Sequence, residues 1–527
     1  MKLSSPAALR IAIVVGAVVM LEVICRLGLV KPINLIPPSA MVARLLDLVR
    51  EAKFWSEVGA TVHNIAFAAL AAWTVGFCAG VVLHGMPRLR RVVEPLIASY
   101  YALPFFVFYP LAVVMLGMSS LPIIVMAALF AVVSMISSTM IGLDRIPGVL
   151  HKSSRTFHLG KIRNALLIQL PATLPDLFAG AKLSLGYCIS GVIGSEFILS
   201  DRGVGYSIAY AYNDFDSRTM YAYLLFVLLL VAIVLSAANW LERRLRYRIG
   251  SNWAITPTLL RAPKLPVRLG ETALLVVVLL AVWQVVFIIA GNEAVASPLM
   301  TAERLPRLLS SRQFWGHAAE TGRALGFALL ISWIGGGLLG VVLGASARAS
   351  DVAEPMVIAL QSTPKVTLYP VMLLFFGLGI AAKVAFGVIH GIIPMTLFTM
   401  NAIRNVNPAL LRTARALRLT RVQTASTILV PAVTPEIVTA VRLSFSITLL
   451  GVIVGELFAS QRGLGFLIMN SIALNDVTTI MAVTTLVVAF ALAVNATLRG
   501  VDRRVREGGQ PQDAVPDSML ISDRVTT

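Results

Sequence analysis

The stretch IAIVVGAVVMLEVICRLGLV, residues 11–30, decides the class of this protein. A helix of about 20 predominantly apolar residues crosses a hydrocarbon core about 30 Å thick. The stretch is too long and too uniformly apolar for a cleaved signal, and no small-residue cleavage site follows it. We therefore interpret it as a retained membrane helix.

Comparable apolar runs recur along the chain, which has 527 residues, 57% of them hydrophobic and 13% charged. The mean hydropathy is +0.84, and a soluble protein of this length needs far more polar surface. The runs predict an all-α polytopic membrane protein with about twelve transmembrane helices, six on each side of a polar break near 241–270. Beside 11–30, the clear runs are 121–143, 220–239, 271–290 and 479–497, and the less pure ones are 62–83, 92–116, 174–199, 321–345, 354–378, 382–401 and 434–459.

The net charge of +18 is explained by the distribution of Lys and Arg among the loops of a membrane protein, and it does not require a polyanionic partner. If the N-terminus is cytoplasmic, the cytoplasmic loops of the first half carry 15 Lys and Arg residues and the opposite loops carry 6. This positive-inside bias predicts that both termini are cytoplasmic, that the partner surface is the lipid bilayer, and that no nucleic acid is bound. The cytoplasmic loops are 84–93, 144–170 and 241–270, and the opposite ones are 30–60, 117–120 and 200–219.

The chain repeats itself at a fixed offset of 260 residues. Tryptophan, proline and glycine residues stay in register over most of the length without a gap, which indicates a duplicated six-helix unit. Because each half begins and ends on the same side, the repeats are parallel, with a pseudo-two-fold axis along the membrane normal and a shared pathway between them. Matching pairs include Trp55 and Trp315, Trp73 and Trp333, Tyr109-Pro110 and Tyr369-Pro370, Pro171 and Pro431, and Arg202-Gly203 and Arg462-Gly463.

Composition divides the chain into four segments. We predict a first transmembrane repeat over 1–250 and a second over 269–500. A cytoplasmic linker at 251–268 contains several prolines among basic residues. The polar segment 501–527, with Pro and Gly, is predicted to be a disordered cytoplasmic tail.

No catalytic or metal-binding pattern occurs in the sequence. It contains no G-x-x-x-x-G-K-[ST] phosphate loop, no H-E-x-x-H, no G-x-S-x-G and no Cys/His cluster. A single embedded histidine such as His390 is more often a hydrogen-bonded structural residue than a ligand. The GxG pairs at 203–205 and 463–465 follow apolar helices, which favours tight turns over a dinucleotide site. We therefore expect no catalytic residue, metal or cofactor on this chain.

Two basic segments resemble each other, SSRTFHLGKIRNALLIQLP at 153–171 and LRTARALRLTRVQTASTILVPAVTP at 411–435. Each combines a short basic segment, a turn and an amphipathic run with an Ile-x-(Leu/Val)-Pro ending. Proline is compatible with the first turn of a helix, where its missing N–H has no partner to lose. The duplication favours docking of a two-fold cytoplasmic partner, and a purely topogenic pair of loops is the alternative.

Two further sets of embedded residues come in pairs. Prolines in the third span of each half predict bent helices that line the pathway, whereas kinks in lipid-facing helices are the alternative. The carboxyl groups of Glu196 and Glu456 lie about one turn inside the outer end of the fifth span. They are candidate substrate contacts, although capping or a hydrogen bond between helices explains them equally well. The prolines are Pro104, Pro110, Pro364 and Pro370.

These features together resemble the permease subunits of ATP-binding cassette importers, in the nitrate/sulfonate/taurine branch. The residues that carry the resemblance are Pro-Pro-Ser at 37–39, the prolines of the third span, the Ile-x-(Leu/Val)-Pro endings, the embedded glutamates and the following Gly-x-Gly. The resemblance covers nearly all of 30–500, twice, and implies two fused six-helix halves in a bacterial inner membrane. It also implies a separate cytoplasmic ATPase dimer that holds ATP and Mg, and an extracytoplasmic substrate-binding protein.

The resemblance implies roles for particular residues. The ATPase is expected at 145–165 and 405–425, and the binding protein near 200–218 and 460–478. The translocation pathway is expected at the four prolines and at Glu196 and Glu456. The residues expected to couple to the ATPase are Arg155, His158, Leu159, Gly160, Ile168, Pro171, Arg415, Arg418, Leu419, Ile428 and Pro431.

This sequence departs from the family pattern in the coupling loop. The family places Gly thirteen residues before the proline, where this chain has His158 and Arg418. Glycine adopts positive φ without strain, so His158 and Arg418 either tolerate that conformation or use another turn, and Gly160 could shift the turn in the first half. The Glu-Ala-Ala positions of the family hold Lys152-Ser153-Ser154 and Arg412-Thr413-Ala414.

The function expected from these features is that of a permease, which moves a small anionic or organic nitrogen- or sulfur-containing solute by alternating access. A self-sufficient secondary transporter is the main alternative, and Glu196 and Glu456 are the only candidates for its ion site. A membrane enzyme is a distant third reading, because the sequence contains no catalytic cluster.

Overall fold

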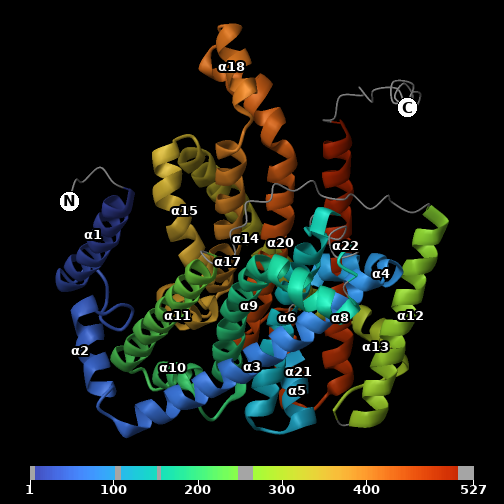
Figure 1. The fold of residues 1–527 in the computed structure, drawn as a ribbon. Coiled ribbons are helices and arrows are strands. Elements are labelled where there is room, and N and C mark those ends of the chain that lie inside the picture. The colour runs from blue at the N-terminus through green and yellow to red at the C-terminus, as the bar shows by residue number, and fades with distance from the viewer. Residues whose placement is uncertain are drawn as a thin grey trace, which may run out of the picture.

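The computed structural model describes residues 6–100, 108–146, 148–150, 156–158, 160–246, 265–292 and 294–508. All regular secondary structure in these ranges is helical (Figure 1). The elements of the first half are α1 (Pro6–Arg26), α2 (Pro38–Leu48), α3 (Ala52–Gly85), α4 (Pro87–Ser99), α5 (Tyr109–Leu116), α6 (Ser120–Asp144), α8 (Lys161–Asn164), the π-helix η3 (Ala165–Gln169), α9 (Leu170–Leu199), α10 (Val204–Asn213) and α11 (Ser217–Arg246).

The second half repeats this order. Its elements are α12 (Leu265–Ala290), α13 (Pro298–Leu309), α14 (Arg312–Gly344), α15 (Ala347–Ser362), the 3-10 helix η4 (Lys365–Leu368), α16 (Tyr369–Phe376), α17 (Ile380–Arg404), α18 (Pro408–Ala416), α19 (Arg421–Thr424), the π-helix η5 (Ala425–Leu429), α20 (Val430–Ala459), α21 (Leu464–Ala473) and α22 (Val477–Gly508).

The third span of the second half is sharply bent, where its prolines predict a bend. Ten helices in the described ranges are long and apolar enough to cross a membrane, or eleven if α15 and η4–α16 together form one span. That pair is bent by 84°, because Thr363 and Pro364 adopt extended backbone between the two helices and Pro364 has no N–H to continue the first. The bend that Pro364 and Pro370 predict within 354–378 is thus a break between two helices. In the predicted span 92–116, α4 ends at Ser99 and α5 begins at Tyr109.

Glycines hold the long helices of each half close together. In the first half, a Cβ on Gly76 or Gly80 of α3 would lie 2.6 Å from the Cβ of Met135 or Thr139 of α6. In the second half, Gly336 and Gly340 of α14 have the same relation to α17. Small residues four apart let membrane helices approach to backbone contact, where dispersion and packing replace the hydrophobic driving force. The sandwich α3–α6–α9 and its repeat α14–α17–α20 form the core of each half.

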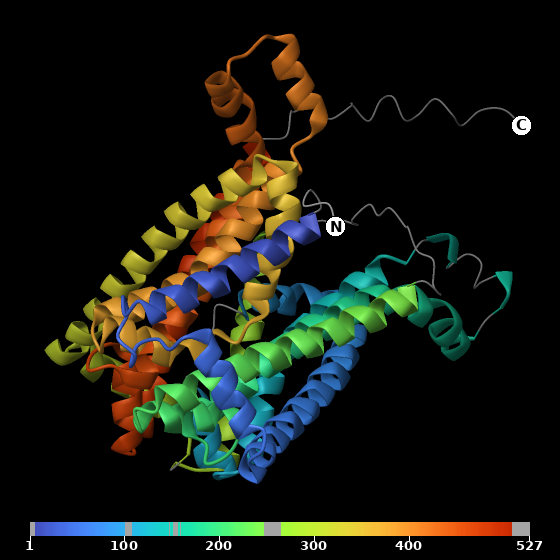
Figure 2. The same cartoon turned by 90° about the vertical axis from the view of Figure 1, so that its left-hand side faces the viewer.

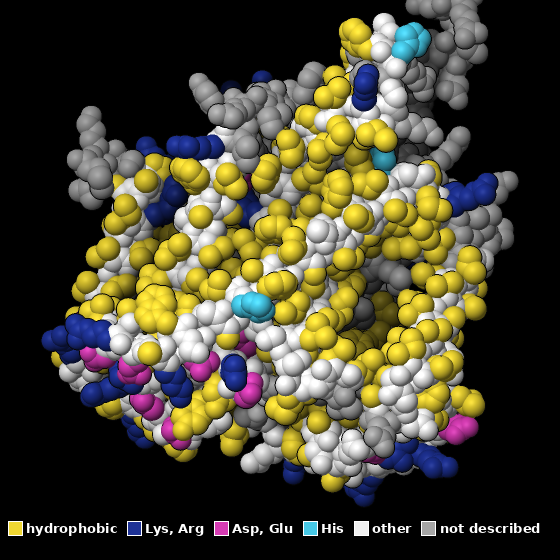
Figure 3. All heavy atoms as spheres, turned by 60° about the horizontal axis from the view of Figure 1, so that its bottom comes forward, with side chains coloured by type: hydrophobic (Ala, Val, Ile, Leu, Met, Phe, Trp, Pro, Cys, Tyr) yellow, Lys and Arg dark blue, Asp and Glu magenta, His cyan; other side chains and the backbone are white. Residues whose placement is uncertain are grey.

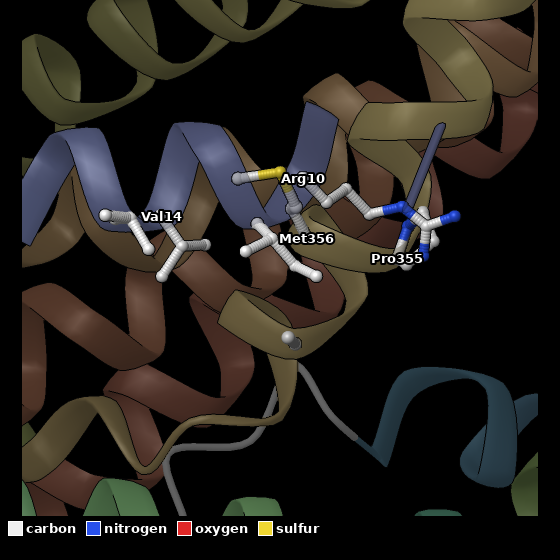
Figure 4. Close-up of a pocket in the computed structure, with 7 residues that line it drawn as sticks. Arg10, Val14, Pro355 and Met356 are labelled. Atoms are coloured by element: carbon white, nitrogen blue, oxygen red, sulfur yellow. The ribbon is translucent and has the colours of Figure 1, made fainter. Parts of the chain in front are cut away.

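The first helix of each half packs on the other half. Helix α1 of the first half contacts α15 of the second, and α12 of the second half contacts α4 of the first, so each half packs its first helix on the other. Figure 4 shows the groove between α1 and α15, a cavity of about 330 Å³. It is lined by Arg10, Ile11, Val14, Val15, Pro355, Met356 and Ala359. The fold is therefore an intertwined pair rather than two separate bundles.

The projecting loops of both halves lie at the same end of the molecule. Figure 2 shows the segment around α8 and the segment around α18 extending away from the end that carries α10. The repeats are therefore parallel, as the sequence predicts. Figure 3 shows that apolar side chains cover much of the surface in that view, with charged side chains gathered towards its edges, as lipid contact requires.

Two predicted boundaries shift in the structure. Helix α12 begins at Leu265, inside the predicted linker 251–268, and α22 continues to Gly508, past the predicted start of the tail at 501. Hydropathy marks where the bilayer ends, whereas a helix of good helix formers continues into water. The rest of the linker and of the tail lies outside the described residues.

Candidate functional site

The two halves meet at a seam where α9 and α20 end. Phe197 of α9 and Phe458 of α20 pack edge-to-face, with ring centroids 4.8 Å apart and planes at 80°. In the repeat, Phe197 corresponds to Leu457 and Ile198 corresponds to Phe458, so each half contributes one ring and one aliphatic side chain. Aromatic pairs in this arrangement add to the stabilisation that apolar burial provides. The seam is thus closed by a contact that only the assembled halves can form.

A cavity of about 170 Å³ lies at this seam. The first half lines it from α9 and α10, and the second half from α16, α20 and α21. The side chains are Phe197, Ile198, Ala209, Tyr212 and Asn213 from the first half, and Tyr369, Leu373, Leu457, Phe458 and Met469 from the second. Apolar walls with a few polar groups are typical of small-molecule sites.

The break in the third span directs Tyr369 to this seam. Its ring packs on Phe386 at 5.0 Å and on Phe458 at 5.4 Å between centroids, and its hydroxyl donates to the carbonyl of Gly455. Pro364, which directly precedes η4, and Pro370 of α16 are both buried, and η4 contacts α9 of the other half. This placement favours the pathway interpretation over lipid-facing kinks for these two prolines. Pro104 lies outside the described residues, and of Pro110 only the backbone, at the start of α5, is described.

Glu196 is enclosed by its own half. Its residue is fully buried, and Oε2 accepts hydrogen bonds from the Thr61 hydroxyl at 2.8 Å and the Gly205 amide at 3.1 Å. Oε1 accepts from Asn64 Nδ2 at 3.2 Å. These contacts favour the hydrogen-bonding role over substrate contact, because no part of the carboxylate is exposed in this conformation.

Glu456 occupies the same position in the second half with one different partner. The Thr321 hydroxyl donates to it at 2.8 Å and the Gly465 amide at 3.1 Å. Ala324 stands where the first half has Asn64, and the ammonium of Lys383 approaches Oε1 to 4.0 Å instead. A charge thus replaces an amide, which keeps the buried carboxylate compensated in both halves.

The two carboxylates hold the GxG turns. Gly203 and Gly463 have φ of 103° and 123°, and a Cβ at either would collide with the carboxylate of its own half. The amide of Gly203 donates to Glu57 Oε2 at 2.5 Å, and that of Gly463 donates to His317 Nδ1 at 3.1 Å. The expected tight turns are confirmed. They clamp α10 and α21 onto the helices that end at the seam.

The turn after α18 explains the position that departs from the family pattern. Arg418 has φ of 53°, its amide donates to Arg415 at 3.1 Å, and the Leu419 amide donates to Ala414 at 3.0 Å. This pair of bonds is a Schellman motif, whose left-handed position is usually glycine because glycine has no Cβ to strain it. Arg418 therefore keeps the turn that glycine would make.

His158 adopts the same left-handed conformation in the first half. Its φ is 49°, whereas Gly160 is not left-handed, so the turn is not shifted to Gly160. Of the two alternatives that the sequence leaves open, the structure shows the left-handed conformation at both His158 and Arg418. Arg155 and Leu159 lie outside the described residues.

A feature absent from the sequence prediction links each loop to its long helix. The π-helices η3 and η5 immediately precede α9 and α20, and the Leu170 amide donates to the carbonyl of Ala165, five residues back. Pro171 and Pro431 follow directly. The proline ring would clash with a carbonyl four residues back, and a wider turn relieves that clash. Each proline therefore lies within a continuous helical rod and not at its beginning.

The projecting loops present exposed side chains on a small frame. In the second loop Arg415, Arg418 and Pro431 are exposed, whereas Leu419 and Ile428 are half-buried. Leu417 exposes 64% of its surface and Phe157 of the first loop 74%, although Ile168 and Pro171 are half-buried. Exposed apolar side chains beside arginines are a composition typical of protein-docking surfaces.

Comparison with known proteins finds the family described as the inner membrane component of binding-protein-dependent transport systems, at residues 72–247 and again at 336–507. A Haemophilus influenzae protein classed as an ABC transporter permease is 26% identical over 43% of this chain and 93% of its own length. The permease SsuC, assigned to aliphatic sulfonates transport in Bacillus subtilis, is 30% identical over 38% of this chain and 72% of its own.

The taurine transport system permease TauC of Escherichia coli is 24% identical over 42% of this chain and 82% of its own length. Each of these relatives corresponds to about one half of the chain. The family matches the chain twice, once in each parallel half. The chain is therefore two permease units fused in one polypeptide. The chain belongs to the binding-protein-dependent transport system inner membrane component family, and it is a tandem permease subunit of an ATP-binding cassette importer that moves a small solute across a membrane.

Proposed function

We propose that this permease imports a small solute that carries a negatively charged group, of the sulfonate, taurine or nitrate kind, driven by a separate ATPase dimer that docks on its two projecting loops. The relatives named for taurine, aliphatic sulfonates and nitrate support the solute class. The paired loops, each with a left-handed turn and exposed apolar side chains, support a two-fold cytoplasmic partner. ATP and Mg are held on that partner, and a substrate-binding protein delivers the solute at the seam end.

The observation that carries the proposal is the continuity between loop and seam. One helical rod runs from Ile162 to Ile198 and another from Ser426 to Phe458. Each rod begins beside a projecting loop and ends at the Phe197–Phe458 contact. A force on the two loops can therefore reach the seam through continuous helices, as alternating access needs. In the present arrangement the seam end is closed.

The topology follows from the same arrangement. If the loops bind a cytoplasmic ATPase, the start of α1 and the end of α22 are cytoplasmic as well, because Figure 1 draws both towards the end that carries α18. The α10 and α21 end then faces outward and receives the binding protein, and the membrane is the bacterial inner membrane. A self-sufficient secondary transporter loses its ion-site candidates, because Glu196 and Glu456 are enclosed by hydrogen bonds of their own halves.

Reconstitution tests this function. The purified chain is placed in proteoliposomes with the ATPase and the binding protein encoded beside it, and uptake of taurine, methanesulfonate and nitrate is measured with and without internal ATP. We expect ATP-dependent uptake of one of these solutes, which stops when either partner is omitted. Uptake by the chain alone along an ion gradient, or failure of any ATPase to co-purify with it, would contradict the proposal.

A further inference from the structure

We propose that Lys365 is the anion-contacting residue of the translocation pathway, a single cationic site at the break in the third span of the second half. The inference rests on the proposed function, since it names the group that recognises the negative charge of the solute. It concerns a residue that lies outside the seam cavity and the projecting loops, and that the sequence did not mark as functional.

Lys365 lies at the break in the third span, on the short helix that contacts the other half. It opens η4, directly after the extended residues that bend the span by 84°. The same short helix contacts α9 of the other half, and Tyr369, one turn further on, lines the seam cavity. Broken helices of this kind form substrate sites in many transporters, because irregular backbone is tolerated where it borders a cavity.

The ammonium of Lys365 is buried without a negative partner. The residue is 8% exposed, and Nζ donates to the carbonyl of Gln361 at 2.9 Å. Within the described ranges no carboxylate lies within 4.0 Å of it, although an ammonium carries three donors. Gln361 Oε1 is also buried there without a hydrogen-bond partner. The break therefore contains hydrogen-bonding capacity, on the Lys365 ammonium and on Gln361 Oε1, that no group in the described part of the chain uses.

Lys383, another buried lysine of this half, is an example of a lysine whose charge is compensated within the protein. Lys383 is 2% exposed, and its ammonium lies 3.4 Å from Glu320, 4.0 Å from Glu456 and 2.6 Å from the carbonyl of Arg462. Two carboxylates and a carbonyl compensate it fully. Lys365 is also buried, but it lacks that compensation within the described residues, so a transient anion can supply the counter-charge.

The single positive charge of Lys365, and its absence from the corresponding position of the first half, both indicate a ligand with one negative charge. A buried, unpaired charge is costly unless a counter-ion accompanies it, and an ionisable group within a membrane is kept for a function. A single lysine binds a monovalent anion weakly enough to release it, as conduction requires. The first half has Phe105 at the corresponding position, so the fused chain carries the cation on one side of its pseudo-two-fold axis.

A first experiment needs neither partner. The melting temperature of the purified full-length chain in detergent is measured in sodium nitrate and sodium methanesulfonate, at constant ionic strength against sodium gluconate. We expect one of the two small anions to raise the melting temperature of the wild type and of Lys365→Arg, and to leave that of Lys365→Met unchanged, because a ligand that binds the native state stabilises it. In gluconate, Lys365→Met should melt at or above the wild-type temperature, since an unpaired buried charge is removed.

Lys383→Met is the matched control. It should melt below the wild type, because it leaves the buried carboxylate of Glu456 without a neighbouring cation, yet it should keep the rise with the small anion. The proposal is overturned if Lys365→Met retains the anion response, or if Lys383→Met loses it and Lys365→Met does not.

A second experiment separates this inference from the function it rests on. In proteoliposomes with the partners described above, Lys365→Met should lower uptake at least tenfold relative to Lys365→Arg, with both variants co-purifying with the ATPase. Unchanged uptake by Lys365→Met would overturn the inference alone. Absence of uptake by the wild type would overturn the proposed function, and the anion response of the melting temperature would still decide the role of Lys365.

Discussion

Four residues other than glycine adopt left-handed backbone in the described ranges, and they form two pairs in the repeat: His158 with Arg418, and Phe215 with Asn475. A non-glycine residue in this region costs roughly 1–2 kcal/mol, and asparagine tolerates it best. The repeat therefore preserves the backbone conformation at positions where it does not preserve the residue. Each pair is an internal comparison of two side chains in one turn.

We predict that Phe215→Asn stabilises the protein. Phe215 has φ of 58° and exposes 74% of its surface, so the substitution relieves backbone strain and loses little apolar burial. The gain should be about 1 kcal/mol, seen as a higher melting temperature of the purified chain. The reverse change, Asn475→Phe, should lower it by a similar amount, and equal melting temperatures for all three proteins would contradict the prediction.

We predict that His158→Gly and Arg418→Gly keep the docking of the ATPase, whereas His158→Val and Arg418→Val weaken it. Glycine relaxes the left-handed turn, and a β-branched residue there is strained by more than the roughly 1–2 kcal/mol of an ordinary side chain. The measurement is the amount of ATPase that co-purifies with each variant. Gly160→Ala is the control and should change nothing, because Gly160 is not left-handed and no atom lies within 4 Å of a Cβ there. Loss of docking in the glycine variants would show that the side chains themselves are recognised.

At the scale of elements, the π-helices decide how the projecting loops are oriented. A π-turn holds one residue more than an α-turn, so each loop is rotated by about 100° relative to a continuous α-helix. Their position before Pro171 and Pro431 in both halves shows that the proline creates the need for the wider turn. The sequence contains the proline as a signal, but not the register of the carbonyls that the ring meets.

We predict that Pro171→Ala together with Pro431→Ala uncouples ATP hydrolysis from transport. Alanine restores the N–H and removes the ring, which permits an α-turn and rotates both loops against their rods. Hydrolysis by the assembled complex should continue while solute uptake per ATP falls several-fold. Pro435→Ala is the control, since Pro435 lies inside α20 after the π-helix. An unchanged uptake per ATP in the double variant would contradict this account.

At the scale of the whole molecule, the reciprocal packing of α1 on α15 and of α12 on α4 makes the halves depend on each other. The Phe197–Phe458 contact adds a second shared surface at the seam. Fusion of the halves therefore places the two units at high effective concentration. It also allows them to diverge, as at Lys365 and Phe105.

We predict that the chain can be cut between Arg246 and Leu265 without loss of assembly. Co-expressed halves should co-purify through a tag on either one, because the contacts of α1 with α15 and of α12 with α4 join helices on the two sides of the cut. Each half expressed alone should be recovered at much lower yield, since the surfaces of α4 and α15 lose their covering helices. The measurement is the yield of the folded complex by size-exclusion chromatography. Stable, monodisperse single halves would show that these contacts contribute little.

The candidate site was only partly predictable. Pro171, Pro431 and the 260-residue repeat located the loops, and the glycines at 203–205 and 463–465 located the turns. The interpretation of Glu196 and Glu456 as substrate contacts was left open, because a buried carboxylate reads the same in sequence whether it meets a solute or Thr61. The sequence does not single out Lys365 for the same reason. Whether a buried lysine has a carboxylate partner depends on side chains from distant parts of the chain.

The sequence by itself determined the membrane class, the duplication, the direction of the repeats and the positions of the loops. These properties depend on hydropathy, charge bias and local turn chemistry, which act over one or two helices at most. Only the tertiary structure decided that α1 and α12 each pack on the opposite half and that Phe197 meets Phe458. It also decided that, among the described residues, Lys383 has carboxylate partners and Lys365 has none. These facts depend on which side chains converge from helices up to hundreds of residues apart, and hydropathy is blind to that convergence.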